Sequence, residues 1–476
     1  MAGTRKAPSE PRKPSAPRRG SPERSQGEEP FGRLERIRVT GLLGQYSHII
    51  ELPQGEPAIL TGANGTGKST ILRLINAVGS GDWPTLSRLP FKGASLYFEN
   101  APKVQVTRRD RRLRIAHSGE ALSIDFAESP LADIPPRALA EMSHAQRLRY
   151  LARRNRLVHG VDPDVVGGDP SIEFATRRAR EQDAFYLSQL SLFGEEVPEV
   201  LRTISERFRV RFITDQRLVV RSDERDVRAR REPGREASAR EPIRRAVTHY
   251  SEDLGRRITM ELRRYANASQ REDRQFPQLV AEELVRERSV ELSELLPLMD
   301  DVAARREALE RVGLAESVPE PKFDRKSLGD PNVQIVFKTF GEATLRKFEV
   351  LEAFRSQLEL FTSFLNRRFI GKTAVTRPEE GLVFFLPDGS ELAPAQLSSG
   401  EQQMLVLAYE VLFETPPGTL LLIDEPEISL HVVWQSTFVE DIAEMGRPRD
   451  LNFLLATHSP TLIGGRRDLT RSLDQG

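Results

Sequence analysis

An eight-residue segment at 62–69, Gly-Ala-Asn-Gly-Thr-Gly-Lys-Ser, lies between an apolar run and a helix-forming run. The preceding residues 57–61, Pro-Ala-Ile-Leu-Thr, predict a short buried strand, and residues 69–76 predict a helix. The small residues of the segment let successive backbone N–H groups wrap around an anion. The chain is therefore expected to contain an α/β layer in which this loop joins a strand to the start of a helix.

The segment matches the pattern G-x-x-x-x-G-K-[ST], whose backbone and helix N-terminus surround the phosphates of a nucleotide. Lys68 would contact the β and γ phosphates and take part in catalysis, and Ser69 would hold Mg²⁺. A chance glycine-rich turn is the alternative, and the flanking strand and helix argue against it. The predicted nucleotide-binding residues of this loop are Gly62, Asn64, Gly65, Thr66, Gly67, Lys68, Ser69 and Thr70.

Residues 419–425, Thr-Leu-Leu-Leu-Ile-Asp-Glu, are an apolar run that ends in two carboxylates. This is typical of a buried parallel strand whose C-terminal end presents acids to a ligand crevice. We predict that Asp424 belongs to the Mg²⁺ shell and that Glu425 orients or deprotonates an attacking water. Paired acids at a strand end, taken alone, are more often a solvated turn, but the phosphate loop upstream favours the catalytic interpretation.

Residues 397–402 read Leu-Ser-Ser-Gly-Glu-Gln and precede a predicted helix at 402–413. A Ser hydroxyl and a Gly N–H group at a helix start suit a terminal phosphate, which makes Ser398, Ser399, Gly400 and Glu401 candidate nucleotide contacts. The alternative is an ordinary helix N-cap with Glu in the first turn. The position of this segment shortly before the acidic strand end favours the phosphate contact.

A further candidate follows the predicted buried strand 451–456, where Thr-His-Ser occupies 457–459. The imidazole of His458 would point into the same crevice and reach the γ phosphate, so His458 joins Lys68 and Glu425 as a predicted catalytic residue. His431, in the loop after Glu425, is a weaker candidate.

These segments, in this order, resemble the phosphate loop, signature motif, acidic strand end and switch histidine of ABC ATPases. The resemblance is closer to the branch that contains SMC, RecF and overcoming-lysogenization-defect nucleases than to membrane transporters. It implies an ABC ATPase head, an α/β fold with a mixed sheet and a phosphate-loop core, that binds ATP and Mg²⁺ and hydrolyses ATP slowly. The phosphate loop of one subunit would face the signature of another, so the resemblance implies at least a dimer.

Composition and pattern divide the chain into four parts. A tail rich in Pro, Ser, Arg and Glu is expected to be disordered, and a mainly helical segment is expected to separate two ATPase lobes. The expected parts are a tail at 1–29, an N-terminal lobe at 30–133, a helical insertion at 134–370 with a strand-like piece at 208–220 and a flexible piece at 221–240, and a C-terminal lobe at 371–476. The helical stretches of the insertion are expected at 135–205 and 241–365.

Alternating apolar and polar residues predict the strands of the N-terminal lobe. Residues 34–39 and 48–52 are expected to start a mixed sheet together with 57–61. A small antiparallel set is expected at 95–98, 104–107, 112–117 and 121–126.

Overall composition narrows the class of protein. The 70 basic residues balance the 70 acidic ones, so any contact with DNA would need a local basic patch. The chain has no cysteine, which excludes disulfides and thiolate sites and is compatible with the expected cytoplasmic location. No apolar stretch approaches the roughly 18–20 residues that a membrane helix needs, so no membrane partner is expected.

Some family positions stay open at the level of sequence. The glutamine that senses Mg²⁺ in related heads is either Gln105, in a strand-like run, or Gln216, which is followed by Arg217. Tyr46 is a candidate for stacking on adenine. Neither assignment follows from the sequence alone.

The 18 residues after His458 are too few for a nuclease domain, so a nuclease would have to act in trans. The compact ATPase with a short helical insertion resembles the ATPase components of bacterial anti-phage systems such as PARIS and Septu. That resemblance implies an oligomer that holds a nuclease or toxin effector and responds to a phage-encoded trigger. The alternatives are a RecF/SMC-like repair ATPase that clamps DNA and a scaffold that binds ATP without hydrolysing it.

Overall fold

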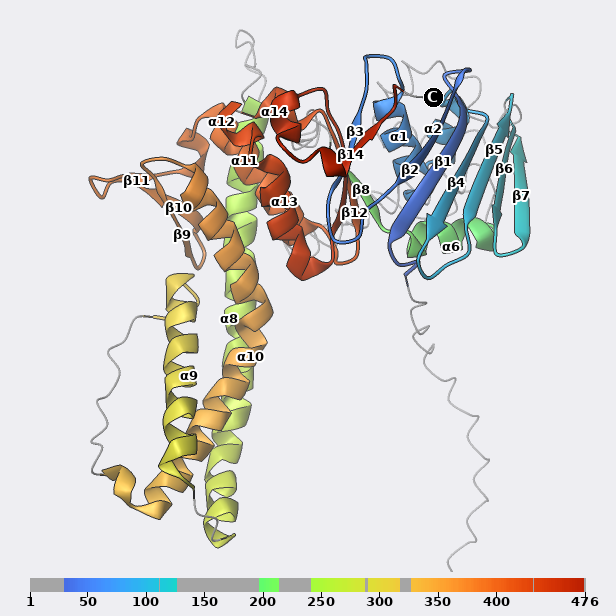
Figure 1. The fold of residues 1–476 in the computed structure, drawn as a ribbon. Coiled ribbons are helices and arrows are strands. Elements are labelled where there is room, and N and C mark those ends of the chain that lie inside the picture. The colour runs from blue at the N-terminus through green and yellow to red at the C-terminus, as the bar shows by residue number, and fades with distance from the viewer. Residues whose placement is uncertain are drawn as a thin grey trace, which may run out of the picture.

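The computed structural model describes residues 30–110, 112–125, 197–213, 241–286, 290–316, 327–430 and 432–474. The predicted tail at 1–29, the predicted flexible piece at 221–240 and most of the predicted helical stretch 135–205 lie outside these ranges. In the described part, a head built around β-sheets carries a long helical stalk (Figure 1).

One sheet of the head is antiparallel, with six strands in the order β2-β1-β4-β5-β6-β7. Buried and exposed residues alternate along β1, where Ile37 and Val39 are buried and Arg36 and Arg38 are exposed. This alternation is expected for a sheet with one covered face, and it confirms the predicted strands. The strands are β1 (Leu34–Leu42), β2 (Tyr46–Glu51), β4 (Gly93–Phe98), β5 (Val104–Arg109), β6 (Arg112–His117) and β7 (Glu120–Asp125).

A second sheet has five parallel strands in the order β14-β3-β13-β12-β8. The expectation that residues 57–61 continue the sheet of the first two strands was wrong, because β3 lies here between β13 and β14. Ala58, Ile59 and Leu60 are all fully buried, and a strand that is apolar on both faces needs a layer on each side. The strands are β3 (Ala58–Thr61), β8 (Val210–Ile213), β12 (Leu420–Asp424), β13 (Asn452–Ala456) and β14 (Thr470–Ser472).

Three helices pack in the N-terminal part of the head (Figure 1). Helix α1 (Lys68–Gly79) follows β3 directly and buries Ile71, Leu72 and Ile75. It contacts α2 (Trp83–Arg88), α6 (Glu199–Arg207) and β8. One hydrophobic cluster joins these helices to the inner face of the six-stranded sheet, so the phosphate loop is fixed to both sheets.

The stalk consists of α8 (Glu241–Val285) and α10 (Pro331–Arg368), which run side by side away from the head (Figure 1). Helix α9 (Leu292–Arg311) packs on α10, and the short 3₁₀ helix η2 (Ser327–Gly329) precedes α10. Within the expected insertion at 134–370, the described residues form α6, β8, η2 and these three longer helices. Strand β8 falls in the strand-like piece expected at 208–220 and belongs to the five-stranded sheet of the head. In the described part of the chain, no helix combines the length and the apolar character needed to cross a membrane.

The C-terminal part of the head packs directly on the base of the stalk. Leu254 of α8, Phe361 of α10 and Tyr409 belong to one buried cluster. A small sheet, β11-β10-β9, adjoins it. Its strands are β9 (Thr373–Arg377), β10 (Gly381–Phe385) and β11 (Glu391–Leu392), and η3 (Pro394–Gln396) follows them.

The helix predicted at 402–413 begins and ends differently from the prediction. Helix α11 spans Ser399–Tyr409, and a π-helical turn, η4 (Glu410–Glu414), continues it. Such turns often occur at functional sites. The remaining elements are η5 (Pro426–Ser429), α12 (Val432–Gln435), α13 (Phe438–Gly446), η6 (Arg447–Arg449), α14 (Pro460–Ile463) and η7 (Arg467–Leu469).

Candidate functional site

The glycine-rich loop leaves β3 and enters α1 through a backbone that only glycine adopts easily. Gly67 has φ 97°, in the left-handed region. A Cβ atom at Gly67 would lie 2.5 Å from Cδ2 of Leu42. The Thr66 hydroxyl donates a hydrogen bond to the carbonyl oxygen of Ala63 at 2.9 Å, which closes the turn. The loop is thus built as an anion-binding turn that leads into a helix N-terminus.

Lys68 lies folded back over this loop. Its ammonium group donates to the carbonyl oxygens of Gly62 at 2.9 Å and Ala63 at 3.2 Å. The side chain is buried, and this burial lowers the pKa of Lys68, while the negative charges of Glu425, Asp474, Asp424 and Glu427 act in the opposite direction. A cationic group is therefore held at the mouth of the loop, within a field of carboxylates.

The two predicted Mg²⁺ ligands come together although 355 positions separate them in the chain. Ser69, in the first turn of α1, donates its hydroxyl hydrogen to Oδ1 of Asp424, with 3.0 Å between the oxygens. Asp424 is the last residue of β12. Mg²⁺ in nucleotide sites is usually held by one or two protein oxygens together with phosphates and water. The adjacent hydroxyl and carboxylate fit that requirement.

Glu425 directly follows β12 and has an unusual backbone. Its φ and ψ are 49° and 52°, which is left-handed for a residue with a side chain. Its N–H group donates to the carbonyl oxygen of Ala456, at the end of neighbouring β13, at 2.8 Å. Strained backbone of this kind is retained where the surroundings enforce it and clusters at active sites. The geometry turns the chain sharply at the position predicted for the catalytic base.

His458 follows β13 and faces Lys68, with 3.5 Å between its Nδ1 atom and the Lys68 ammonium nitrogen. The ring is exposed, whereas the preceding Thr457 is fully buried. Strands β3, β12 and β13 are parallel, so the phosphate loop, the two acids and His458 all follow the carboxyl ends of strands in one sheet. We call this end of the sheet the sheet edge. The structure brings the predicted residues Lys68, Ser69, Asp424, Glu425 and His458 together at this edge.

Two acids at this edge were missed from the sequence. Glu427 accepts hydrogen bonds from the Thr457 hydroxyl at 2.7 Å and from the His458 N–H group at 2.8 Å. Asp474, after β14, accepts a hydrogen bond from the N–H group of Ala63 at 2.8 Å. Glu427 follows the predicted base, Glu425, by two residues, and this closeness in sequence could have indicated that it belongs to the site. Nothing in the sequence around Asp474 pointed to the phosphate loop.

The predicted signature segment forms the start of α11. Ser398 is the N-cap, and its N–H group donates to Glu401 at 2.9 Å, while the Ser398 hydroxyl accepts from the Glu401 N–H group at 3.4 Å. Ser398 and Glu401 therefore form a capping box, which is the alternative that the sequence left open. Ser399 is exposed beside them, and a Cβ atom at Gly400 would lie 3.2 Å from Trp434.

The capping box is tied to the base of the stalk. Lys372, just after α10, donates to Glu401 at 2.7 Å. Burial works to raise the pKa of Glu401, but Lys372 and the hydrogen bonds from Ser398 outweigh it and hold that pKa below its usual value. The helix N-terminus thus has its capping acid fixed as a carboxylate, and Ser399 stays at the surface.

A second polar network joins the stalk to η4. Asp253 of α8 accepts from Arg257 at 2.7 Å and from the Tyr409 hydroxyl at 2.5 Å. Arg257 also donates to Glu414 at 2.5 Å. Burial works to raise the pKa of Asp253, and Arg257 together with the Tyr409 hydroxyl overcomes this and lowers it. The network connects the stalk to the turn that links α11 to β12.

The other sequence candidates lie elsewhere. Gln105 is half-buried in β5, opposite Ser95 and Ala116 in the antiparallel sheet, and Tyr46 stacks on His48 with 6.0 Å between ring centroids. Gln216, Arg217 and His431 lie outside the described residues. In the described part of the chain, no hydrogen bond or ion pair joins residues 398–401 to residues 62–70.

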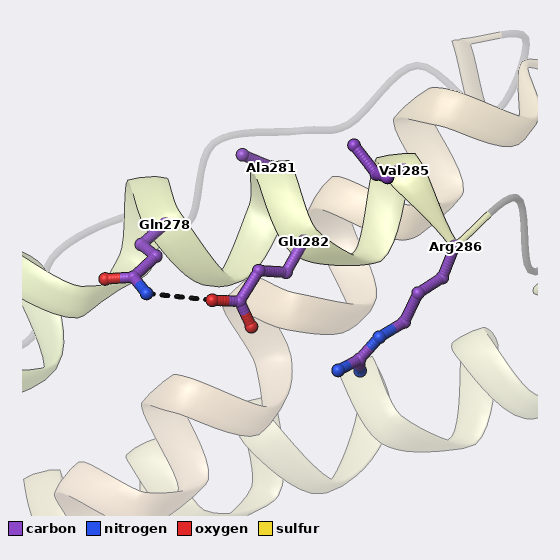
Figure 2. Close-up of a pocket in the computed structure, with 5 residues that line it drawn as sticks. All are labelled: Gln278, Ala281, Glu282, Val285 and Arg286. Carbon is purple, nitrogen blue, oxygen red and sulfur yellow. Dashed lines mark hydrogen bonds between the residues drawn. The ribbon is translucent and has the colours of Figure 1, made fainter.

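A surface hollow near the far end of α8 is remote from these residues. It is lined by one helix face, and Figure 2 shows Gln278 donating to Glu282, at 2.8 Å, beside Val285 and Arg286. None of the predicted site residues lines it. We therefore place the candidate site at the sheet edge and not at the stalk tip.

Comparison with known families adds a classification to this geometry. The family model described as "AAA domain, putative AbiEii toxin, Type IV TA system" matches residues 96–464. The chain belongs to this family. The match includes Asp424, Glu425 and His458, and the phosphate loop at 62–69 precedes it.

Curated relatives match this chain over a short stretch. The chain is 39% identical over 67 residues to a probable iron chelatin transport ATP-binding protein of Helicobacter pylori and to the thiamine import ATP-binding protein ThiQ of a Chelativorans species. These stretches cover 14% of this chain and 25% and 26% of those relatives. The chain thus spans about a quarter of the length of the curated relatives it matches.

Solved structures similar to this chain include heads of Smc proteins. The Smc head of Pyrococcus furiosus, bound to the C-terminal domain of ScpA, is 14% identical with a TM-score of 0.32, and 91% of each chain is covered. The SMC head of Thermotoga maritima is 12% identical with a TM-score of 0.31, and 90% of this chain and 91% of that chain are covered.

Proposed function

We propose that this chain binds ATP with Mg²⁺ and hydrolyses it in a site shared by two copies, and that its nucleotide state controls a nuclease or toxin effector supplied by another chain. The process it serves would be anti-phage defence. The observation that carries the proposal is the convergence of Lys68, Ser69, Asp424, Glu425 and His458 on one edge of the parallel sheet.

Each residue has a chemical role at this edge. The N–H groups of the glycine-rich loop and the Lys68 ammonium group would bind the phosphates, and Ser69 and Asp424 would hold Mg²⁺. The metal would neutralise charge on the phosphate oxygens when bound. Glu425 would orient or deprotonate the attacking water, and His458, which lies beside Lys68, would contact the γ phosphate. The products would be ADP and phosphate.

The separation of the two motifs supports a shared site. Residues 398–401 make no hydrogen bond to the phosphate loop in the described chain, yet Ser399 and the N-terminus of α11 are open to an anion. A second copy that supplies these donors would complete the coordination of the γ phosphate. ATP would then hold two heads together, and hydrolysis would release them.

The control of an effector is supported by the connection between the site and the stalk. Lys372 and the network of Asp253, Arg257 and Tyr409 join α11 and η4 to the stalk helices. A change at the nucleotide would therefore reach α8 and α10. The family of this chain carries a toxin description, which is consistent with a role in abortive defence.

The test uses a Glu425→Gln variant, tagged in its native host and purified with ATP and Mg²⁺. This variant should retain ATP and stay assembled, so that mass spectrometry and native mass report its partners. A stoichiometric nuclease or toxin-like protein supports the proposal. Recovery of DNA with replication or repair proteins contradicts the defence role. Wild-type protein without ATP turnover contradicts the ATPase itself.

The six-stranded sheet favours a second candidate function, a RecF/SMC-like ATPase that clamps DNA. Its exposed face carries Arg36, Arg38, Arg109 and Arg114. Among the described residues, none of these four arginines has a carboxylate partner in an ion pair, and Arg36 lies over the ring of Tyr97. Arginines on one face suit nucleic-acid phosphates. The Arg38→Glu and Arg114→Glu double variant should lose DNA-stimulated ATP turnover if this function is correct, and an unstimulated wild type would exclude it.

A further inference from the structure

Glu427 bridges the two loops that hold the predicted catalytic base and the predicted switch histidine. It lies in η5, two residues after Glu425. One carboxylate oxygen, Oε1, accepts hydrogen bonds from the Thr457 hydroxyl at 2.7 Å and from the His458 N–H group at 2.8 Å. A single side-chain atom therefore fixes both the buried residue before the switch histidine and the backbone of the histidine itself.

The bridge continues into a closed ring of hydrogen bonds. The Ser459 N–H group donates to the Thr457 hydroxyl oxygen at 2.9 Å, and the Ser459 hydroxyl donates to Oε1 of Gln435 at 2.9 Å. The Gln435 amide donates to the carbonyl oxygen of Glu427 at 3.3 Å. The loop after β12 and the loop after β13 are thus joined at two places, by the Glu427 side chain and by its backbone.

The bridge also has a feature that a purely structural contact would not need. The second carboxylate oxygen of Glu427, Oε2, is buried and has no hydrogen-bond partner among the described residues. Buried polar atoms without partners are uncommon in folded proteins, because each loses its hydration without compensation. The negative charge of Glu427 also works to raise the pKa of Lys68. The ammonium nitrogen of Lys68 lies 3.5 Å from Nδ1 of His458. The carboxylate therefore lies where its charge faces the predicted site.

We propose that Glu427 is a positioning residue, which sets His458 against Lys68 and couples the loop of Glu425 to the loop of His458. The proposal rests on the proposed ATPase function and deepens it. A shift of the chain at Glu425 would move the Glu427 carboxylate and, through it, the backbone of His458. Movement of the histidine on the γ phosphate would in turn be transmitted to the loop that carries the base.

Two substitutions separate the contributions of this side chain. Glu427→Ala removes both hydrogen bonds and the charge. Glu427→Gln keeps an oxygen that can accept from Thr457 and His458, removes the charge and puts an NH₂ group in place of Oε2. If positioning is the role, the Ala variant should lower kcat about 10-fold and the Gln variant should recover most of that loss. The affinity for ATP should stay within about 2-fold in both, since the phosphate loop is untouched.

A double-mutant cycle with His458→Ala distinguishes positioning from general stabilisation. If Glu427 acts through the histidine, Glu427→Ala should reduce kcat by less than about 2-fold when His458 is already Ala. Effects on kcat that multiply in the double variant would overturn the proposal, as would a Glu427→Ala variant with wild-type kcat. Glu440→Ala, at an exposed position of α13, is the matched control and should leave kcat unchanged.

The result also separates this inference from the ATPase proposal. Wild-type protein that does not hydrolyse ATP overturns the proposed function, whereas an active wild type with an insensitive Glu427 overturns only the positioning role. If Glu427→Ala does not fold, Thr457→Val tests the same bridge, because it keeps the shape and removes the hydroxyl donor. That variant should lower kcat without changing ATP affinity, and an unchanged kcat would overturn the proposal.

Discussion

The two halves of the candidate site are built in opposite ways. At the sheet edge, Lys68, Asp424 and Glu425 supply charged side chains, and they are held by contacts between distant parts of the chain. At the start of α11, the charged side chain of Glu401 is used internally, and the surface offers a hydroxyl and backbone N–H groups. In the proposed function, the first half performs the chemistry on a phosphate and the second half only binds it.

This difference bears on the proposed pairing of two copies of the chain around ATP. The sheet-edge half places Lys68 among several carboxylates, which repel the γ phosphate in part, whereas a helix N-terminus attracts an anion without a means of hydrolysis. In the proposed shared site, a second copy would therefore give each half what it lacks. The comparison is testable, because substitutions at the sheet edge and at α11 should fail in different ways.

The largest expected effect on ATP turnover comes from substitutions at the sheet edge. Glu425→Gln should reduce ATP turnover about 100-fold or more, because general-base catalysis is lost, while ATP binding persists. Lys68→Ala should abolish ATP binding, because the phosphates lose their cation. Turnover assays and binding of a fluorescent ATP analogue measure the two effects. Equal loss of binding in both variants would contradict the assignment of Glu425 to chemistry.

A mixing experiment tests whether the halves belong to different subunits. Ser399→Asp adds an acid where Asp is favourable for the helix, and it should repel the γ phosphate. Lys68→Ala and Ser399→Asp should each be inactive alone. Their mixture should recover up to about one quarter of the wild-type turnover, since statistical pairing leaves one intact composite site in half of the dimers. A mixture as inactive as its components would show that both halves act within one chain.

The connection of α11 to the stalk should affect stability and its pH dependence. Lys372→Met leaves Glu401 largely buried without its cation and should cost about 1–3 kcal/mol at neutral pH. The folded-state pKa of Glu401 is lowered, so its contribution is present above the unfolded value of about 4.3 and is lost as pH falls through the folded pKa. Urea unfolding of both proteins should therefore show a difference at pH 7 that shrinks on acidification.

The smallest expected effects distinguish the two adjacent serines, Ser398 and Ser399. Ser398→Ala removes the N-cap and should lower the free energy of unfolding by about 1 kcal/mol. Ser399→Ala should change stability by less than about 0.5 kcal/mol, because the side chain is exposed, and should reduce ATP turnover instead. Thermal unfolding and ATP turnover should be measured for both variants. If both variants lose stability, or both lose only turnover, the two serines do not have the different roles predicted here.

Much of the fold was predictable because the signals were local. The apolar run before Asp424 and the glycine-rich loop before Lys68 each specify a strand end or a helix start within a few residues. The alternation in β1 and β4 to β7 likewise predicted half-buried strands. The prediction that β3 belongs to the six-stranded sheet was wrong for a physical reason. A local apolar pattern predicts that a strand forms, but it does not predict which strands pair with it.

The sequence by itself determined the phosphate loop, the acidic strand end and the order of the motifs, because each depends on short-range backbone preferences and burial patterns. Only the tertiary structure decided that Asp474 accepts from Ala63 across 411 positions, that Glu427 holds His458, and that Lys372 fixes Glu401. These contacts depend on which strands and helices become neighbours. That choice is made by packing of the whole chain, and no local pattern contains it.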